Sequence, residues 1–228
     1  MRIAVIPARG GSKRIPRKNL RPFLGKPIMA YSIDAARNSG LFDHIVVSTD
    51  DDEIAALAQS LGAEVPFRRP AALSDDHTGT NTVARHALDW FESTGQAVTE
   101  VCCLYATAPF VVGDDLKRAR DLLKPEFDFV FAAARFEFPI QRAVVRDGAG
   151  LVQPMFPQWI GMRSQDLPEA LHDAGQFYWG WPQSFREHPV VFLARAAAYE
   201  LPSHRVQDID TPDDWIRAEQ LFRISNGE

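Results

Sequence analysis

Ile6-Pro-Ala-Arg-Gly-Gly-Ser-Lys-Arg-Ile-Pro-Arg-Lys-Asn-Leu20 follows directly on a short apolar run, Arg2 to Ile6, that is typical of a β-strand. The part from Arg9 to Arg21 contains six cations and no acid: Arg9, Lys13, Arg14, Arg17, Lys18 and Arg21. Gly10 and Gly11 lie among these cations, and glycine lets successive backbone N–H groups approach an anion closely. The loop therefore predicts a binding site for a nucleoside triphosphate.

The loop differs from the commonest phosphate-binding patterns. The Walker pattern requires GxxxxGK followed by Ser or Thr, and the dinucleotide fingerprint requires GxGxxG, whereas this loop reads Arg9-Gly-Gly-Ser-Lys13. On charge alone, a solvated basic loop that touches nucleic acid is the alternative. The position after a first strand favours a small-ligand site, because open α/β sheets bind ligands at the carboxyl ends of their strands.

Charge is distributed unevenly along the 228 residues. The net charge is −5, yet residues 1–33 carry eight cations and no acid, which leaves −13 for the remainder. A generally acidic chain with one basic loop is typical of an enzyme with a local anion site and not of a sequence-reading DNA-binding protein. We therefore expect no nucleic acid partner.

The cysteines and the apolar runs of the sequence bear on the cellular location of the protein. Cys102 and Cys103 are adjacent, so on a strand they point to opposite faces and are poorly placed to pair, which fits a reducing compartment. The apolar run after Met1 is too short for a signal peptide, and no apolar stretch approaches the ~18 residues of a membrane span. We expect a cytoplasmic protein without a membrane partner.

Strand and helix patterns alternate through the first two-thirds of the chain. Runs of buried type predict strands at residues 3–6, 44–48, 64–67, 101–105 and 129–133, and apolar periodicity predicts helices at 27–39, 51–61, 80–93 and 114–123. This alternation indicates an α/β fold, in which a mostly parallel sheet carries helices on both faces.

The alternation stops after residue 138. Residues 139–181 are rich in Pro, Gln, Trp and Phe and read as an irregular or small antiparallel insertion that shapes a substrate pocket or an oligomer contact. The chain ends with a helix at residues 212–222, for which Thr211 is the expected N-cap and Pro212 the first turn. We expect residues 1–228 to form a single domain.

Asp208 and Asp210 lie two residues apart in what reads as a strand, so both carboxylates face one way. Two such carboxylates repel unless a cation joins them, and a Mg²⁺ ion that also holds phosphates would do so. The alternative is a helix cap, since Asp210-Thr-Pro-Asp-Asp214 is good capping chemistry.

Other polar groups follow strands. Ser48-Thr-Asp50 is either a ligand-binding edge or an ordinary turn, and the polar loop from Arg68 to Thr80 is either a base or ribose site or a surface loop. The small residues after Tyr105 leave space for a sugar. Cationic and amide groups suited to an acidic sugar occur further on, at Gln141, Arg142 and Arg163.

Taken together, these segments resemble the CMP-sialic acid synthetase family, cytidylyltransferases that activate nine-carbon acidic sugars. The resemblance is carried in family order by four segments: Ile6–Leu20, Ile45–Asp50 with Glu53-Ile-Ala55, Arg69-Pro70 and Asp208-Ile-Asp210. It implies a Rossmann-like nucleotidyltransferase sheet, CTP as substrate, Mg²⁺ as cofactor and a homodimer in which the irregular region reaches the partner.

The family's site residues carry over position by position. The resemblance implies triphosphate contacts along the basic loop, comprising Ala8, Arg9, Gly10, Gly11, Ser12, Lys13, Lys18 and Asn19. It implies cytosine contacts at Arg69 and Thr80, and metal ligands at Asp208 and Asp210, with Arg9, Lys13 and Asp210 as catalytic residues. The expected sugar contacts are Tyr105, Gln141, Arg142, Arg163 and Gln176.

Within the family the chain is most similar to the enzymes of pseudaminic acid. Segments such as Pro66–Pro70, Phe138–Arg142 and His172–Trp179 support this, whereas N-acetylneuraminate enzymes usually have Gln at the position of Tyr105 and Asn-Gly at Ala174-Gly175. The expected reaction transfers CMP from CTP to the sugar's anomeric hydroxyl and releases pyrophosphate. The alternatives are an enzyme for legionaminic or N-acetylneuraminic acid, and a non-catalytic nucleotide-binding domain.

Overall fold

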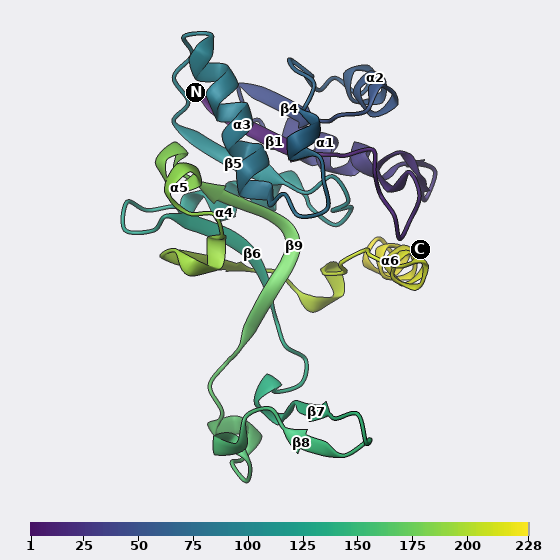
Figure 1. Ribbon diagram of the computed structural model, residues 1–228, viewed down its shortest axis with the longest axis vertical. Helices are drawn as coiled ribbons and strands as arrows, with labels where there is room; N and C mark the ends of the chain where they lie inside the picture. Colours follow the sequence, from purple (N-terminus) through teal and green to yellow (C-terminus); the bar gives the residue numbers. More distant parts are fainter. Residues whose placement is uncertain (228) are drawn as a thin grey trace.

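A six-stranded sheet forms the centre of the molecule in the computed structural model, which describes residues 1–227 (Figure 1). The strands lie in the order β10-β6-β9-β5-β1-β4. Their bounds are β1 Arg2–Pro7, β4 His44–Ser48, β5 Glu100–Leu104, β6 Phe129–Arg135, β9 Leu171–Gly180 and β10 Ala196–Glu200. Strand β1 pairs in parallel with both β4 and β5, and β6 pairs in parallel with β10.

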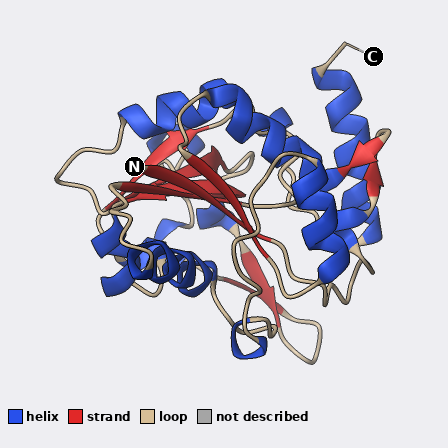
Figure 2. Ribbon diagram, turned by 90° about the horizontal axis from the view of Figure 1, so that it is seen from above, coloured by secondary structure: helices blue, strands red, loops and turns tan. Residues whose placement is uncertain are grey.

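Helices cover both faces of this sheet (Figure 2). Apolar side chains of α1 (Ile28–Ser39), α2 (Asp52–Ser60) and α4 (Gly113–Asp121) share one buried cluster with one face of the strands. Side chains of α3 (Thr80–Ser93) and α5 (Pro182–Glu187) share a second cluster with the other face. Cys102 belongs to the first cluster and Cys103 to the second, as strand alternation predicts. The expected α/β class is confirmed.

Strand β9 was not predicted, and it makes the sheet mixed. It lies between β5 and β6 and is antiparallel to both. It connects the two halves of the sheet, and its apolar residues Phe177 and Trp179 are buried in the first cluster. The expectation that residues 139–181 form an irregular or small antiparallel insertion was therefore wrong for residues 171–180, because this run is a central strand of the main sheet.

Residues 136–170 form an arm that extends away from the sheet between β6 and β9 (Figure 1). Its regular structure is the two-stranded hairpin of β7 (Val144–Arg146) and β8 (Val152–Pro154), with short 3₁₀ turns beside it. Both hairpin strands are exposed along their whole length. The irregular or antiparallel character expected for this part of the insertion is confirmed.

A few other elements also differ from those predicted. Residues 64–67 contribute only an isolated bridge from Glu64 to Val46. Strand β10 and the short α5 were not predicted, and neither were the two-residue strands β2 (Pro22–Phe23) and β3 (Lys26–Pro27). Among the described residues, no helix is long and apolar enough to cross a bilayer.

A third apolar cluster fixes the C-terminal helix α6 (Pro212–Ser225) beside the basic loop. Its buried members include Ile15 from the loop, Ile209 from the segment before α6, and Trp215. The side chain of Thr211 accepts a hydrogen bond from the backbone N–H of Asp214, which confirms the predicted N-cap. The packing of Ile15 near Ile209 places the two aspartates that flank Ile209 beside the cations of the loop.

We expect Gly180→Ala to destabilise the protein. A Cβ atom at Gly180 would lie 2.6 Å from Cδ1 of Phe129 and 2.9 Å from Cε2 of Phe185, and both rings are buried. Overpacking of this kind costs about 1–3 kcal/mol, to be measured by urea unfolding. Gly148→Ala is the control, since a Cβ there meets no heavy atom of the described residues within 4 Å. Equal stability of the two variants would contradict the packing argument.

Candidate active site

A cavity of about 200 Å³ opens where β1 and β5 end. Most of the site residues predicted from the basic loop line it, together with residues from three distant segments. The lining comprises Pro7, Arg9, Ser12, Lys13, Arg14, Ile15, Lys18, Asn19, Thr80, Tyr105, Ala106, Thr107 and Asp210. The structure thus brings one predicted metal ligand, Asp210, to the predicted phosphate loop.

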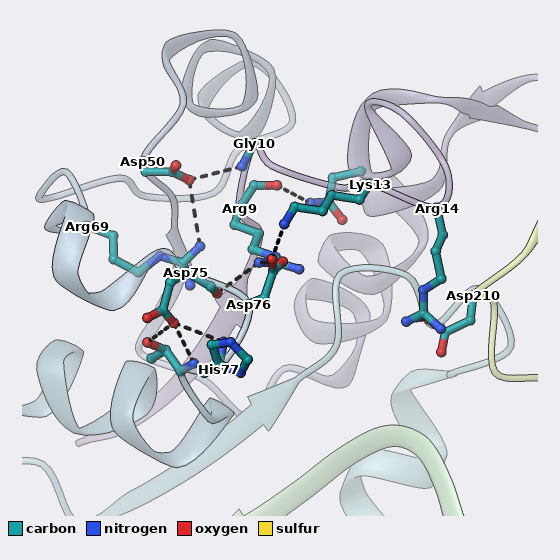
Figure 3. Close-up of polar contacts among 12 residues, drawn as sticks. Arg9, Gly10, Lys13, Arg14, Asp50, Arg69, Asp75, Asp76, His77 and Asp210 are labelled. Atoms are coloured by element: carbon teal, nitrogen blue, oxygen red, sulfur yellow. Dashed lines mark hydrogen bonds and ion pairs between the residues drawn. The ribbon is translucent and has the colours of Figure 1, made fainter.

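Backbone contacts fix the first part of the loop. The N–H of Ala8, a buried residue, donates to the carbonyl of Ser48 at 2.9 Å, which extends the β1–β4 ladder by one bond. The N–H of Gly10 donates to Oδ1 of Asp50 at 3.0 Å (Figure 3). The side-chain amide of Asn19 donates to the carbonyl of Arg9 at 2.9 Å, which closes the loop on itself. Asp50 and Asn19 therefore position the residues between them.

Arg17 anchors the second part of the loop. It adopts a left-handed backbone conformation, with φ of 56°, that a residue with a side chain rarely takes. Its guanidinium is 2.5 Å from Oδ2 of Asp51 and also pairs with Glu53. Asp51 caps α2 by accepting from the N–H groups of Glu53 and Ile54. The hydrogen bond from Arg17 holds the pKa of the Asp51 carboxyl below its usual range.

Two cations of the cavity share one carboxylate. The ammonium of Lys13 and the guanidinium of Arg9 both pair with Asp76, Arg9 at 2.6 Å (Figure 3). Arg9 also donates to the backbone carbonyl of Asp75 at 2.8 Å. The hydrogen bonds from Lys13 and Arg9 lower the pKa of the Asp76 carboxyl. The loop before α3 is thus joined to the basic loop by charge.

Asp210 lies on the other side of the cavity, 2.8 Å from Arg14 and 3.7 Å from Lys18. Lys18 also donates to the carbonyl of Ile209 at 2.7 Å, and burial lowers the pKa of its ammonium. Partial burial, reinforced by the charge of Asp210, raises the pKa of Asp208. Residues 206–210 form an irregular segment, so the predicted strand was wrong, although the two carboxylates still interact.

A second cavity of about 200 Å³ adjoins the first and shares Pro7, Arg9 and Thr80 with it. Arg69 lines it and is buried, with only 6% of its surface exposed. Within the described residues, Nε and Nη2 of Arg69 have no hydrogen-bond partner, and the carboxylate of Asp50 is 3.8 Å from Nη2. Burial lowers the pKa of this guanidinium. Unpaired buried donors of this kind fit an acceptor on a ligand.

A third, more apolar cavity of about 210 Å³ shares Thr80 and Tyr105 with the first. The hydroxyl of Tyr178 donates to Oγ1 of Thr80 at 2.5 Å, and Asp173 also lines this cavity. Burial raises the pKa of Tyr105, so its hydroxyl stays protonated. Gln176 lies beneath the site on β9: its carbonyl accepts from the N–H of Tyr105 at 2.8 Å.

The remaining predicted sugar residues lie on the arm. Gln141 is buried there and donates to the carbonyl of Pro168 at 2.7 Å. Arg142 donates to the carbonyl of Met162, and Arg163 pairs with Asp166 at 2.7 Å. Within one chain, the structure places these three residues away from the cavities that Tyr105 lines.

Some residues of the site were not assigned a role from the sequence: Arg14, Asp51, Asp76 and Asp173. Two segments were noted as possible ligand sites, Ser48-Thr-Asp50 after the predicted strand 44–48 and the loop Arg68–Thr80 that contains Asp76. The interactions of Asp76 with Arg9 and of Asp173 with Asp208 had no sequence signal, because each joins residues more than 30 positions apart. Only the folded chain brings these charges together.

Sequence comparison assigns the family. The model of the family described as Cytidylyltransferase matches residues 3–199, and the chain therefore belongs to the cytidylyltransferases, a group of nucleotidyltransferase enzymes. The pseudaminic acid cytidylyltransferase of Campylobacter jejuni is 44% identical over 98% of this chain and 97% of its own length. The CMP-N,N'-diacetyllegionaminic acid synthase of Legionella pneumophila is 32% identical over the same shares.

Solved structures agree on the fold. The structure of a CMP:2-keto-3-deoxy-manno-octonic acid synthetase complexed with CTP superposes with a TM-score of 0.69 and covers 98% of this chain and 99% of its own. Its sequence is only 18% identical, so it bears on the fold alone. The α/β sheet that carries the basic loop is thus the architecture of that synthetase.

We expect Gly10→Ala to impair CTP binding. A Cβ atom at Gly10 would lie 2.7 Å from Oδ2 of Asp51, which is held by Arg17, so the loop must shift. Displacement of a binding loop by about 1 Å costs up to about 100-fold, and we expect a 10- to 100-fold weaker Kd by calorimetry. Gly11→Ala is the matched control, because a Cβ there meets no described heavy atom within 4 Å. Similar Kd values for both variants would refute the argument that position 10 must be glycine because Asp51 leaves no space for a Cβ atom.

Proposed function

We propose that this cytidylyltransferase transfers CMP from CTP to the anomeric hydroxyl of pseudaminic acid and releases pyrophosphate. The observation that carries the proposal is the joined pair of cavities. One is lined by Arg9, Lys13 and Lys18, and the other holds buried donors of Arg69 that have no hydrogen-bond partner among the described residues. A polyphosphate matches the first cavity and an acceptor-bearing base matches the second. The identity of 44% to a pseudaminic acid enzyme supports the choice of sugar.

In the nucleotide half of the site, each residue has a proposed role. Arg9, Lys13 and the hydroxyl of Ser12 bind the phosphates with the N–H group of Gly11, while the N–H of Gly10 holds the loop on Asp50. Lys18 and Asn19 act through the loop, since they donate to backbone carbonyls of Ile209 and Arg9. Arg69 donates to the acceptors on the cytosine ring, and Thr80 lies at the junction of the cavities.

Asp208 and Asp210 fit a hard cation such as Mg²⁺. Partial burial, and then the nearby charge of Asp210, raise the pKa of Asp208, and a bound cation would stabilise its ionised form. No group of three or more His, Cys, Asp and Glu side chains that could hold a metal occurs in residues 1–227. The protein would therefore supply two ligands and the phosphates the others. A bound Mg²⁺ supplies charge neutralisation at the phosphate oxygens.

The chain's own residues account for much of the chemistry. The anomeric hydroxyl forms a bond to the α-phosphorus in line with the bond to the departing pyrophosphate, which breaks. Such a transfer depends on positioning and on charge stabilisation. Arg9 and Lys13, which line the first cavity, would stabilise the negative charge that develops on the α-phosphate and on pyrophosphate. Residues Tyr105 and Thr80 separate this region from the third cavity, which receives the sugar.

The sugar half of the site requires a second copy of the chain. Arg142 and Arg163, which suit the sugar's carboxylate, lie on the arm and away from the cavities of their own chain. The arm exposes large apolar side chains: Phe138, Val144, Leu151, Val152 and Ile160 are each more than half exposed. A concentration of exposed apolar side chains on one segment supports an interface there. A homodimer in which each arm reaches the partner satisfies both observations.

The proposed reaction is tested by pyrophosphate release with CTP, Mg²⁺ and three sugars in parallel: pseudaminic, legionaminic and N-acetylneuraminic acid. We expect turnover with pseudaminic acid and at least about 10-fold lower kcat/KM with the others, the discrimination that a few altered contacts provide. Turnover with another acid alone would replace the substrate and keep the reaction. CTP binding without turnover on any of the three would favour a non-catalytic nucleotide-binding domain.

We expect Asp208→Asn to lose turnover without losing stability. Loss of a metal ligand lowers kcat by about 100-fold or more. The pKa of Asp208 is raised in the folded protein, so its ionised form opposes folding as pH rises through that raised pKa. The variant lacks this charge and should gain stability relative to wild type as pH rises above the ordinary pKa of an aspartate, as measured by urea unfolding at a series of pH values.

Glu126→Gln is the control for Asp208→Asn, since Glu126 is an exposed carboxylate outside the site. It should change neither turnover nor the pH dependence of stability. Full Mg²⁺-dependent turnover in the Asp208 variant would remove that carboxylate from the metal site and leave a structural role.

A further inference from the structure

Asp76 neutralises the two cations that the proposed function assigns to the triphosphate. Its Oδ1 is 2.6 Å from Nη1 of Arg9, and its Oδ2 pairs with Nζ of Lys13. The carboxylate stands at the junction of the phosphate and base cavities, because Asp76 lines the cavity that contains Arg69. Figure 3 shows both cations turned toward it. Chemically, these two oxygens stand in for two oxygens of a phosphate.

The segment around Asp76 depends on these contacts. Within the described residues, the hydrogen bonds and ion pairs that join residues 74–79 to chain outside residues 70–83 all go to Arg9 or Lys13. The other bonds of the segment are local: the carboxylate of Asp75 accepts from the N–H groups of His77 and Thr78 and from the Thr78 hydroxyl. The phosphate-binding cations therefore hold this segment in place.

We propose that Asp76 is an internal counter-ion of the phosphate site, which nucleotide must displace from Arg9 and Lys13. This inference rests on the proposed function. A triphosphate and the carboxylate cannot use the same N–H donors, and their negative charges repel at this separation. Without nucleotide, Asp76 offsets the repulsion between Arg9 and Lys13 and keeps both directed into the cavity. With nucleotide, the released segment 74–79 becomes free to rearrange over the base.

The need to displace Asp76 lowers the apparent affinity for nucleotide. Only a fraction of the free protein molecules have Arg9 and Lys13 released from Asp76 and ready to bind. The pairs are partly exposed, with 77% of the Lys13 side chain and 36% of the Asp76 side chain accessible. Exposed pairs are individually weak, so the effect is limited to about three- to tenfold for two of them. This effect on affinity decreases with rising salt concentration, because salt screens both ion pairs.

Asp76→Asn tests the proposal, since asparagine keeps the size of the side chain and removes its charge. Calorimetry with EDTA present measures the Kd of CTP and, separately, of inorganic tripolyphosphate. We expect both to bind the variant about three- to tenfold more tightly than wild type. Asp52→Asn is the matched control: it removes a charge from the neighbouring α2, where Asp52 pairs with Arg68, and should leave both Kd values unchanged.

Each outcome decides a separate question. Equal or weaker binding by Asp76→Asn, with normal binding by wild type, would overturn the counter-ion role and make Asp76 a positioning residue. Tighter binding by Asp52→Asn of the same size would reduce the effect to net charge and also overturn it. Failure of wild type to bind either CTP or tripolyphosphate would overturn the proposed function itself, and this inference with it.

Amide hydrogen exchange supplies a readout that does not depend on affinity. Without ligand, residues 74–79 should exchange several-fold faster in Asp76→Asn than in wild type, because their ion pairs to the basic loop are gone. Tripolyphosphate should raise exchange of the same amides in wild type and leave the variant little changed. Slow exchange of this segment in the unliganded variant would contradict the dependence of residues 74–79 on the cations.

Discussion

Mutual repulsion of the cations in the basic loop is the constraint on which the site depends. Six cations within residues 9–21 cannot fold into a compact loop unless acids from elsewhere approach them. Three distant segments supply these acids: Asp51 with Glu53, Asp76, and Asp210. Because the acids come from three directions, the cations are drawn apart around a central cavity instead of collapsing onto one partner. The anion site is thus a consequence of how the loop is neutralised.

These ion pairs orient the side chains but are too weak to fix the basic loop against the segment before α6, since exposed pairs contribute only about 0.2–1 kcal/mol each. Apolar burial does so. Ile15 and Ile209 are fully or almost fully buried in one cluster with Trp215, so the loop and the segment of the two aspartates are packed together regardless of salt. Stacking of the Arg21 guanidinium on Trp215, 4.6 Å from the ring centre, adds to this contact. Packing sets the distance between cations and carboxylates, and charge then sets their orientation.

Local signals were sufficient for much of the fold. Helix α3 forms over the predicted residues 80–93, and Thr211 caps α6, because periodicity and capping are properties of neighbouring residues. Strand β10 is Ala196-Ala-Ala-Tyr-Glu200, whose alanines carry no strand preference, and it forms because β6 offers a free edge. Strand β9 and the pairing of Asp76 likewise depend on contacts between distant residues. For the site, the loop, Arg69 and Asp210 could be found from the sequence, whereas the pairing of Asp51, Glu53 and Asp76 with the cations of the loop could not.

The two halves of the proposed site differ in how they are built. The nucleotide half lies at the sheet edge within one chain, where β1, the loop before α3 and the segment before α6 meet. The cations proposed to bind the sugar lie on the arm, beyond β6 and β9, and these strands pair along much of their length, so the base of the arm is part of the sheet. Within one chain, Arg142 and Arg163 lie away from the cavities that Tyr105 lines. The proposed function therefore makes CTP binding a property of the single chain and turnover a property of the assembled dimer.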